Sequence, residues 1–599
     1  MPSATHTPRP ARRLGPVLAV LAAAVATFAS ALWPRASPAR LEIGAYDGGV
    51  LDGPWSRAQR AEIDPPAATD EVMSFYFRIA RSGSRAALPL RSAGPVRVSW
   101  RARAAVRSSL GLFVGGRKAG EVLVGTGPWT RYEIQVPAPL AADGLDLTLA
   151  LRPLAVVTGD HAGNPEVLVD FVELAAPEGL RPTRGAAMAL GLLPAAVFAF
   201  ALLVGTRAVP AAAASAAAAG GAIALLVASP LALVAAAPRL VPLAAAAGAL
   251  CHALLGRTAL APRDRTRLAW LVAAGTLAHA ALPFFPNHNP PDLETHVTRT
   301  LDLQDVPLER EALMRYGSHL PTRSQVAAPG SDLFGTRTLI PYTPLPYFVY
   351  HALYRAGLDL HWAMTAFNAA LLMAVAPWLW LAATRLWSPR AAWLAVALYA
   401  LDLPLWHHLG RAHAPASFGA ALTLFALAFL ARFADELGRP ARAASAALLL
   451  CAASLGYSSA LVLVGLFGAL LLLLLAADAR ALPPAARRGG ALALLAGGAL
   501  ALLLYYGHYV PALLSGARAV EAVPDLFPGA RFAIFHNESR QALRVWRLGF
   551  WIPALAGLAA APLALRRAWP AGRPVLVAWL GAWAMVMVLK EPALFPRLL

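Results

Sequence analysis

Two carboxylates at the start of a polar loop are the side chains best suited to catalysis in this 599-residue chain. Asp292 and Glu294 follow an apolar run and the prolines Pro290 and Pro291. One carboxylate raises the pKa of its neighbour, and an apolar rim adds a desolvation effect, so one of the pair can serve as a general base. The other can orient an acceptor or hold a divalent cation, Mg²⁺ or Mn²⁺, through hard oxygen ligands. Whether a metal takes part stays open.

The same residues also fit an ordinary helix start. Prolines followed by acids are typical of a first helical turn, where the acids complement the helix dipole. If a helix begins at Asp292, then His296 and Arg299 lie on its face, one and two turns further on. The spacing alone therefore allows both a catalytic pair and a helix N-terminus.

A second set of candidate binding groups lies in the segment 406–413, which contains His407, His408, Arg411 and His413. Guanidinium and imidazole groups at a membrane surface can grip a phosphate or diphosphate through charge-assisted hydrogen bonds. The imidazoles could also bind a transition metal. Adjacent histidines point in different directions on a helix, so a solvated interfacial loop is the third interpretation.

Two further segments contain candidate polar residues. The first contains Tyr342 and Tyr347 among prolines, and the second, 508–548, has mixed charge that includes His536 and Arg540. Loops as long as the second are usually functional or mobile. No P-loop or Rossmann fingerprint stands between a predicted strand and helix. That absence argues against a cytosolic enzyme that uses a nucleotide sugar.

The elements that position these groups are membrane helices. The chain is 58% hydrophobic and 14% charged, whereas a soluble globular protein has about one quarter charged residues. Its mean hydropathy is +0.55. We therefore predict a polytopic α-helical membrane protein with about 12 to 13 spans. Beyond the N-terminal run, the predicted spans are 186–206, 211–229, 240–256, 268–286, 361–384, 391–406, 415–433, 443–458, 459–476, 490–507, 549–565 and 574–590.

The N-terminal segment 1–37 is predicted to be a signal anchor and first transmembrane helix. Basic residues at 9–13 precede an apolar run, 14–33, that is long enough to span a bilayer. The small residues at 29–31 would also suit signal cleavage. With either outcome, the segment that follows is exported.

Residues 38–180 differ from the rest of the chain and predict an antiparallel β-sandwich. The stretches Val96–Trp100, Tyr132–Val136 and Leu145–Leu149 alternate apolar and polar residues, which is the period of half-buried strands. Glycine and proline separate these stretches. Trp55, Trp100 and Trp129 are either sugar-stacking platforms or, more commonly for such residues, core and edge aromatics.

The formal net charge of +19 raises the question of a nucleic-acid partner. The basic residues are spread over the connections between spans, however, and this argues against nucleic acid and sets the topology by the positive-inside rule. With the N-terminus inside, the β domain and the loops 286–341 and 508–548 fall outside. The inner connections then contain Arg207, Arg257, Arg263, Arg265, Arg267, Arg385, Arg390, Arg432, Arg439, Arg442, Arg480, Arg487, Arg488, Arg566, Arg567 and Arg573.

Several of these features occur together in one known clan. An acidic pair in a large outer loop is followed by the Tyr/Pro-rich segment Ile340–Arg355 and by a span with Asn368 that ends in Arg385-Leu386-Trp387. In this arrangement the chain resembles the GT-C superfamily of polytopic glycosyltransferases, the clan of protein mannosyltransferases and lipid A aminoarabinose transferases. The similarity covers residues 265–480 and is strongest over 286–300 and 340–435.

The chain also departs from the clan's pattern. It has Tyr-Thr-Pro-Leu-Pro-Tyr where the common form has adjacent prolines, and Asp-Leu-Glu where many members have Asp-Glu. Four predicted spans and the β domain precede the acidic loop, which in the clan usually follows the first span. The N-terminal half of the chain thus lies outside the resemblance.

The resemblance implies an inverting glycosyltransferase that takes a sugar from a polyprenyl-phosphate donor to an extracytoplasmic glycan, lipid or protein. Asp292 would be the catalytic base and Glu294 its partner. The groups expected to bind the donor phosphate are His296, Arg299, His407, His408, Arg411 and His413. The residues expected to enclose donor and acceptor are Tyr342, Tyr347, His536 and Arg540.

We expect the protein in the bacterial cytoplasmic membrane, in contact with its lipids, with the active site and the β domain outside. The predicted divisions are 1–37, the β domain 38–180, additional helices 181–260 and a catalytic domain 261–599. A transporter or lipid flippase without covalent chemistry is the alternative, and it predicts ionisable residues at mid-bilayer depth in broken helices. A non-catalytic cell-envelope assembly protein is the third possibility.

Overall fold

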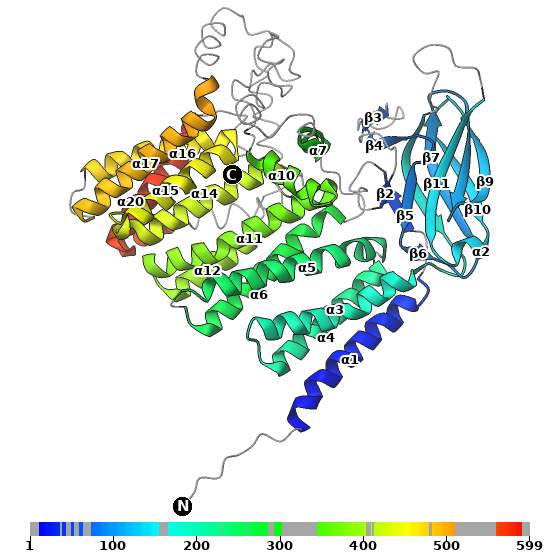
Figure 1. Ribbon diagram of the computed structural model, residues 1–599, viewed down its shortest axis with the longest axis horizontal. Coiled ribbons are helices and arrows are strands. Elements are labelled where there is room, and N and C mark those ends of the chain that lie inside the picture. Colours follow the sequence, from blue (N-terminus) through cyan, green and yellow to red (C-terminus); the bar gives the residue numbers. More distant parts are fainter. Residues whose placement is uncertain are drawn as a thin grey trace, which may run out of the picture. The chain divides into compact units, whose positions relative to one another are not determined.

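The computed structural model describes residues 11–35, 39–43, 50–52, 59–63, 73–154, 166–228, 230–258, 260–284, 293–301, 343, 345–402, 409, 413–477, 482–509, 557 and 559–589. The chain forms two compact units, Met1–Glu294 and Thr295–Leu599, and each is described by itself. Among the described residues, the first unit contains the strands and five long helices, and the second unit is helical throughout (Figure 1).

The first unit contains an antiparallel β region, as the alternating stretches predict. Its described strands form one sheet in the order β10-β7-β12-β4-β3 with β1 beside β12, a second sheet in the order β2-β5-β11-β8-β9, and a short β13-β6 pair. The strands are β1 Ala39–Glu42, β2 Leu51–Asp52, β3 Gln59–Ile63, β4 Met73–Ala80, β5 Arg85–Leu88, β6 Leu90–Arg91, β7 Val96–Ala104, β8 Ser108–Val114, β9 Arg117–Val124, β10 Thr130–Val136, β11 Leu145–Pro153, β12 Val167–Ala175 and β13 Arg181–Pro182, with the short helix α2 Ala138–Ala141 after β10.

Both larger sheets contribute to one hydrophobic core. Along β7, Val98 and Trp100 are buried, and along β11 the alternate residues Leu145 and Leu147 belong to the same cluster. Trp100 is 3% exposed, so it is a core residue and not a sugar-stacking platform. Trp129 is half-buried, with its ring edge-on to Phe77 and the Arg103 guanidinium 5.4 Å from its centroid. Trp55 lies outside the described residues.

The helices of the first unit are α1 Ala11–Leu32, α3 Arg184–Leu203, α4 Ala208–Ala228, α5 Pro230–Leu255 and α6 Pro262–Ala280, followed by the 3₁₀ turn η1 Leu282–Phe284. Small residues let α1 and α3 approach closely, because a Cβ on Gly191 would lie 3.0 Å from Phe28 Cβ. The Thr183 hydroxyl accepts a hydrogen bond from the amide of Ala186 and so caps α3.

The start of α5 differs from the sequence prediction. The helix runs from Pro230 through Pro238 and Pro242, whereas a span near 240–256 is predicted. Apolar helices tolerate internal prolines because neighbouring helices and side chains satisfy the freed backbone groups. Between the two prolines, the Arg239 guanidinium donates a hydrogen bond to the carbonyl of Ala235 at 2.7 Å. The helix therefore begins earlier than the predicted span.

The second unit is a helical bundle. Its described elements are α7 Leu293–Leu301, which crosses the division between the units, then α10 Leu345–Arg355, α11 Leu360–Leu386, α12 Pro389–Ala400, α14 Ala414–Phe433, η3 Ala434–Glu436, α15 Pro440–Gly456, α16 Ser458–Ala477, α17 Pro484–Leu504, η4 Tyr506–Tyr509, η5 Pro570–Gly572 and α20 Arg573–Leu589. Helices α11, α14, α15 and α17 pack in sequence, and α16 packs on α20 (Figure 1). Ser388 and Asp359 cap α12 and α11 through their side-chain oxygens.

Within the described residues, eight helices are long and apolar enough to cross a membrane: α1, α3, α4, α5, α11, α14, α16 and α17. This set is compatible with a multi-pass membrane protein. Four other predicted spans correspond to helices outside the set. The first turns of α6 are polar, because they contain Arg263, Asp264, Arg265 and Arg267. Helices α12, α15 and α20 are shorter, with 12, 17 and 17 residues.

Candidate functional site

The described residues include only part of the predicted site. Asp292, Tyr342, His407, His408, Arg411, His536 and Arg540 lie outside them. Glu294 and Arg299 have a described backbone on α7 but not a described side chain. His296, Tyr347 and His413 are described fully. The predicted carboxylate pair and its cation therefore stay predictions.

Helix α7 is short and amphipathic, and it begins at Leu293, one residue after the predicted start. Leu293 and Val297, four residues apart, are both buried and lie on one face. His296 lies beside them and is 3% exposed. The Thr300 hydroxyl donates to the carbonyl of His296 at 2.8 Å. The helix carrying Glu294 is thus held by an apolar face with a buried histidine on it.

His296 joins α7 to α10 through a buried hydrogen bond. Its Nδ1 lies 2.9 Å from the phenol oxygen of Tyr347, and Tyr347 is fully buried. A buried polar pair of this kind stabilises one arrangement, because breaking it leaves a desolvated group without a partner. The histidine predicted to touch phosphate therefore has a tyrosine as its partner.

The buried polar contacts continue from α10 into α11 and α14. The ring of Tyr347 stands edge-on to that of Tyr350, with centroids 6.2 Å apart. The Tyr350 phenol oxygen and the Asn368 amide are hydrogen bonded, and the same amide nitrogen donates to the carbonyl of Ala414 at 3.1 Å. Burial raises the pKa of Tyr350, so it remains a neutral phenol. We call His296, Tyr347, Tyr350 and Asn368 the polar chain.

The polar chain brings together two segments that carry candidate catalytic groups. At one end is α7, directly after Asp292. At the other end is Ala414, the first residue of α14, and His413 is the N-cap residue before it. The His/Arg segment 406–413 therefore ends next to Ala414, whose backbone carbonyl accepts the hydrogen bond from Asn368. Sequence spacing cannot reveal this neighbourhood, because the contacts join residues far apart in the chain.

Several buried polar atoms on or next to these elements have no hydrogen-bond partner among the described residues. They include Thr343 Oγ1, His351 Nδ1, Thr365 Oγ1 and Ser417 Oγ. Thr365 lies one turn before Asn368, and Ser417 lies one turn after Ala414. Unpaired groups are uncommon in protein interiors. The neighbourhood is thus unusually polar for an apolar bundle, and it offers hydroxyl and imidazole groups for hydrogen bonding.

Sequence reasoning missed part of this arrangement. Tyr350, His351, Thr365 and Ser417 were not among the predicted site residues. One signal for Tyr350 is its spacing of three from Tyr347 on a helix, which puts both rings on one face. Asn368 stands out as a polar residue inside an apolar span, but its partners could not be identified from the sequence.

Comparisons with known proteins do not assign the chain. No protein-family model matches it, and no curated protein matches it. Among solved structures, one match is the Clostridium thermocellum endo-1,4-β-D-xylanase 10B, in a structure of its CBM22-1 and GH10 modules with xylohexaose. It is 13% identical, covers 24% of this chain and 29% of that chain, and has a TM-score of 0.17. A similarity this low carries no argument about fold or function.

Proposed function

We propose that the protein is a membrane glycosyltransferase of the GT-C type that uses a polyprenyl-phosphate sugar as donor. The observation that carries the proposal is the polar chain from His296 to Asn368. It connects α7, the helix that follows the predicted base Asp292, with the start of α14 after the His/Arg segment. A transferase needs its base and its phosphate-binding groups within reach of one substrate, and this arrangement supports that requirement.

In the proposed reaction, Asp292 takes the proton from an acceptor hydroxyl. The hydroxyl oxygen forms a bond to the anomeric carbon, and the bond between that carbon and the phosphate oxygen breaks. The electron pair leaves with the polyprenyl phosphate, and the anomeric configuration inverts. Cationic side chains of segment 406–413 and Arg299 stabilise the charge that develops on the leaving phosphate, as preorganised positive groups do in general.

The proposal also assigns each segment of the chain to one side of the membrane. Signal anchor α1 places the β region outside the cytoplasmic membrane of a bacterium, and its two sheets pack face to face as a sandwich around their shared core. The arginine-rich helix ends lie inside, in accord with the positive-inside rule. The acidic loop and the segments 406–413 and 508–548 then face outward, where lipid-linked sugars and envelope acceptors meet.

The test uses the purified full-length chain in detergent with undecaprenyl-phosphate mannose, radiolabelled in the sugar, and a cell-envelope extract as acceptor source. We expect labelled product and released undecaprenyl phosphate. Asp292→Asn should abolish both at unchanged protein level, whereas Asp143→Asn, an exposed acid of the β region, should leave the rate unchanged. Because the sugar is not fixed, undecaprenyl-phosphate aminoarabinose is the second probe.

Two outcomes would contradict the proposal. Full activity of Asp292→Asn would remove the base from the mechanism. Uptake of the lipid-linked sugar into proteoliposomes, without any product from either probe, would favour the transporter instead.

A further inference from the structure

One end of the second unit's helix bundle is rich in arginine. The C-terminal ends of α11 and α14 meet there, because Arg385 of α11 contacts both acids of η3. The turn η5 joins them through a hydrogen bond from the amide of Trp569 to the carbonyl of Leu386. The first turns of α15 and α17 complete this end, which we call the arginine end.

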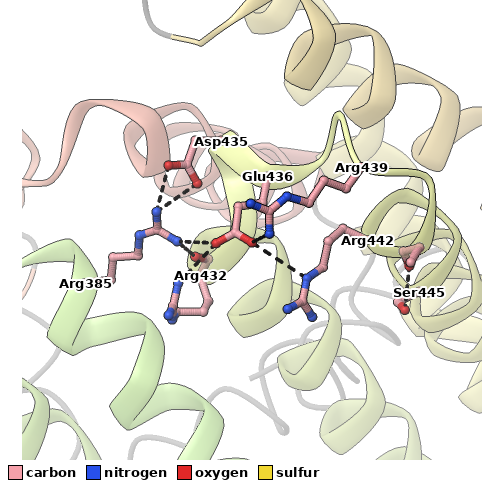
Figure 2. Close-up of polar contacts among 8 residues, drawn as sticks. Arg385, Arg432, Asp435, Glu436, Arg439, Arg442 and Ser445 are labelled. Carbon is pink, nitrogen blue, oxygen red and sulfur yellow. Dashed lines mark hydrogen bonds and ion pairs between the residues drawn. The ribbon is translucent and has the colours of Figure 1, made fainter. Parts of the chain in front are cut away.

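An ion-pair cluster forms the centre of the arginine end (Figure 2). Arg385 binds both carboxylate oxygens of Asp435, at 2.9 and 2.7 Å, and reaches Glu436 at 3.3 Å. Glu436 also pairs with Arg439 at 2.9 Å and lies 3.9 Å from Arg442. The two carboxylates are therefore already shared among several guanidinium groups.

Positive charge at the arginine end exceeds negative charge by a wide margin. Its described ionisable side chains include only two acids, Asp435 and Glu436. The arginines there are Arg385, Arg390, Arg432, Arg439, Arg442, Arg487, Arg488, Arg566, Arg567 and Arg573. Ten positive charges against two negative charges leave a formal excess of eight in the described part of this end.

Close contacts at two glycines hold the start of α15 beside the start of α17, and each of these helix starts carries two arginines. A Cβ on Gly489 of α17 would overlap the carbonyl oxygen of Leu437, and one on Gly438 would lie 3.0 Å from the carbonyl carbon of Ala485. Helices α15 and α17 consequently lie side by side from their first turns onward (Figure 1). Arg439 and Arg442 begin one helix, and Arg487 and Arg488 lie near the start of the other.

An exposed apolar stripe runs along α17 from these arginines. Arg488, Leu492 and Leu495 follow at intervals of four and three residues, so they lie on one helix face. Arg488 is exposed, and the two leucines are 64% and 60% exposed. On α20, Val577 and Leu580 follow the half-buried Arg573 at the same intervals. A cation above an exposed apolar stripe matches a phospholipid, which has an anionic headgroup above acyl chains.

We propose that the junction of α15 and α17 is a binding site for an anionic phospholipid. The phosphate lies among Arg439, Arg442, Arg487 and Arg488, and the acyl chains lie along Leu492 and Leu495. Arg487 is half-buried, and its Nε has no hydrogen-bond partner among the described residues. The site is separate from the polar chain and does not depend on the glycosyltransferase proposal.

Native mass spectrometry of the full chain in detergent tests the site, with phosphatidylglycerol and phosphatidylcholine of identical acyl chains as probes. We expect tighter binding of phosphatidylglycerol, and loss of that preference at high salt, because salt screens exposed charges. The double variant Arg439→Gln/Arg488→Gln should bind phosphatidylglycerol about 30-fold more weakly, which is about fivefold for each arginine. Arg97→Gln/Arg117→Gln removes two exposed arginines of the β region and should change nothing.

Equal binding of the two lipids would overturn the site, and so would unchanged phosphatidylglycerol affinity in the Arg439→Gln/Arg488→Gln variant. Displacement of phosphatidylglycerol by millimolar inorganic phosphate would show a simple anion site instead of a lipid site. The salt and headgroup comparisons use the unmodified chain, so they remain decisive if the double variant fails to fold.

Discussion

The amide nitrogen of Asn368 donates a hydrogen bond to the phenol oxygen of Tyr350 at 3.0 Å, and both side chains are completely buried. Asn368 lies in α11 and Tyr350 in α10, 18 residues apart in sequence. Because the same amide also holds the carbonyl of Ala414, one side chain fixes the relative positions of three helices. Stability and the proposed activity both depend on this contact.

Replacing Asn368 with leucine should destabilise the second unit. The change leaves the Tyr350 hydroxyl and the Ala414 carbonyl buried with fewer partners, at a cost of about 1–3 kcal/mol for each group that loses its only partner. Thermal unfolding in detergent measures the effect. Thr365→Val is the matched control, since the buried Thr365 hydroxyl has no hydrogen-bond partner in the described part of the chain. That variant should be neutral or stabilising, and an equal loss in both variants would contradict the role given to Asn368.

Tyr347→Phe removes only the hydroxyl that bonds His296. We expect about tenfold slower sugar transfer, because a small misplacement of a catalytic group lowers the rate steeply, together with faster hydrogen exchange in α7. The overall melting temperature should fall only slightly. Tyr354→Phe on the same helix is the control, because Tyr354 is 39% exposed. Unchanged exchange in α7 would show that the hydroxyl does not hold this helix.

Gly489→Ala should destabilise the bundle by about 1–3 kcal/mol or more, because the new methyl group overlaps the Leu437 carbonyl and must push α17 away from η3. Gly498→Ala on the same helix meets no atom within 4 Å. It should raise stability by up to about 1 kcal/mol through helix propensity. Opposite signs in the two unfolding curves are the expected result, and equal signs would contradict the close packing.

Much of the fold follows from the sequence because its signals are local. An apolar run of membrane length predicts α11 or α16 directly, and alternation predicts β7 and β10. The start of α5 was predicted too late, because the helix continues through Pro238 and Pro242. Charge in the first turns of α6 likewise made the predicted span begin late, at 268 instead of Pro262.

The site was less predictable, and the reason is physical. Tyr347 and His296 were both named from sequence, but as ligands of substrate and not as partners of each other. Their pairing results from the packing of α7 on α10, which no spacing rule describes. Arg385 was assigned to an inner connection from its place in the sequence. The contact of one of its guanidinium nitrogens with both carboxylate oxygens of Asp435 depends on two helix ends meeting.

Arg385→Gln should loosen the ends of α11 and α14. It removes the ion pair with Asp435 and the cation above the Trp569 ring, 4.1 Å from the ring centroid. The pair is partly exposed. We therefore expect the free energy of unfolding to fall by about 1–2 kcal/mol, which lies between the values for surface and buried ion pairs. Arg390→Gln alters an exposed residue five positions on and should cost almost nothing. Chemical unfolding in detergent measures both, and equal effects would contradict the cluster's role.

The anomeric configuration of the product tests the central proposal most directly. Undecaprenyl-phosphate β-mannose, labelled with ¹³C at the anomeric carbon, is incubated with the full chain and an envelope acceptor fraction, and the one-bond carbon–hydrogen coupling is read by NMR. The account predicts an α-linked product from the wild-type protein and none from Asp292→Asn. A β-linked product, or α-linked product at the wild-type rate from Asp292→Asn, would contradict it.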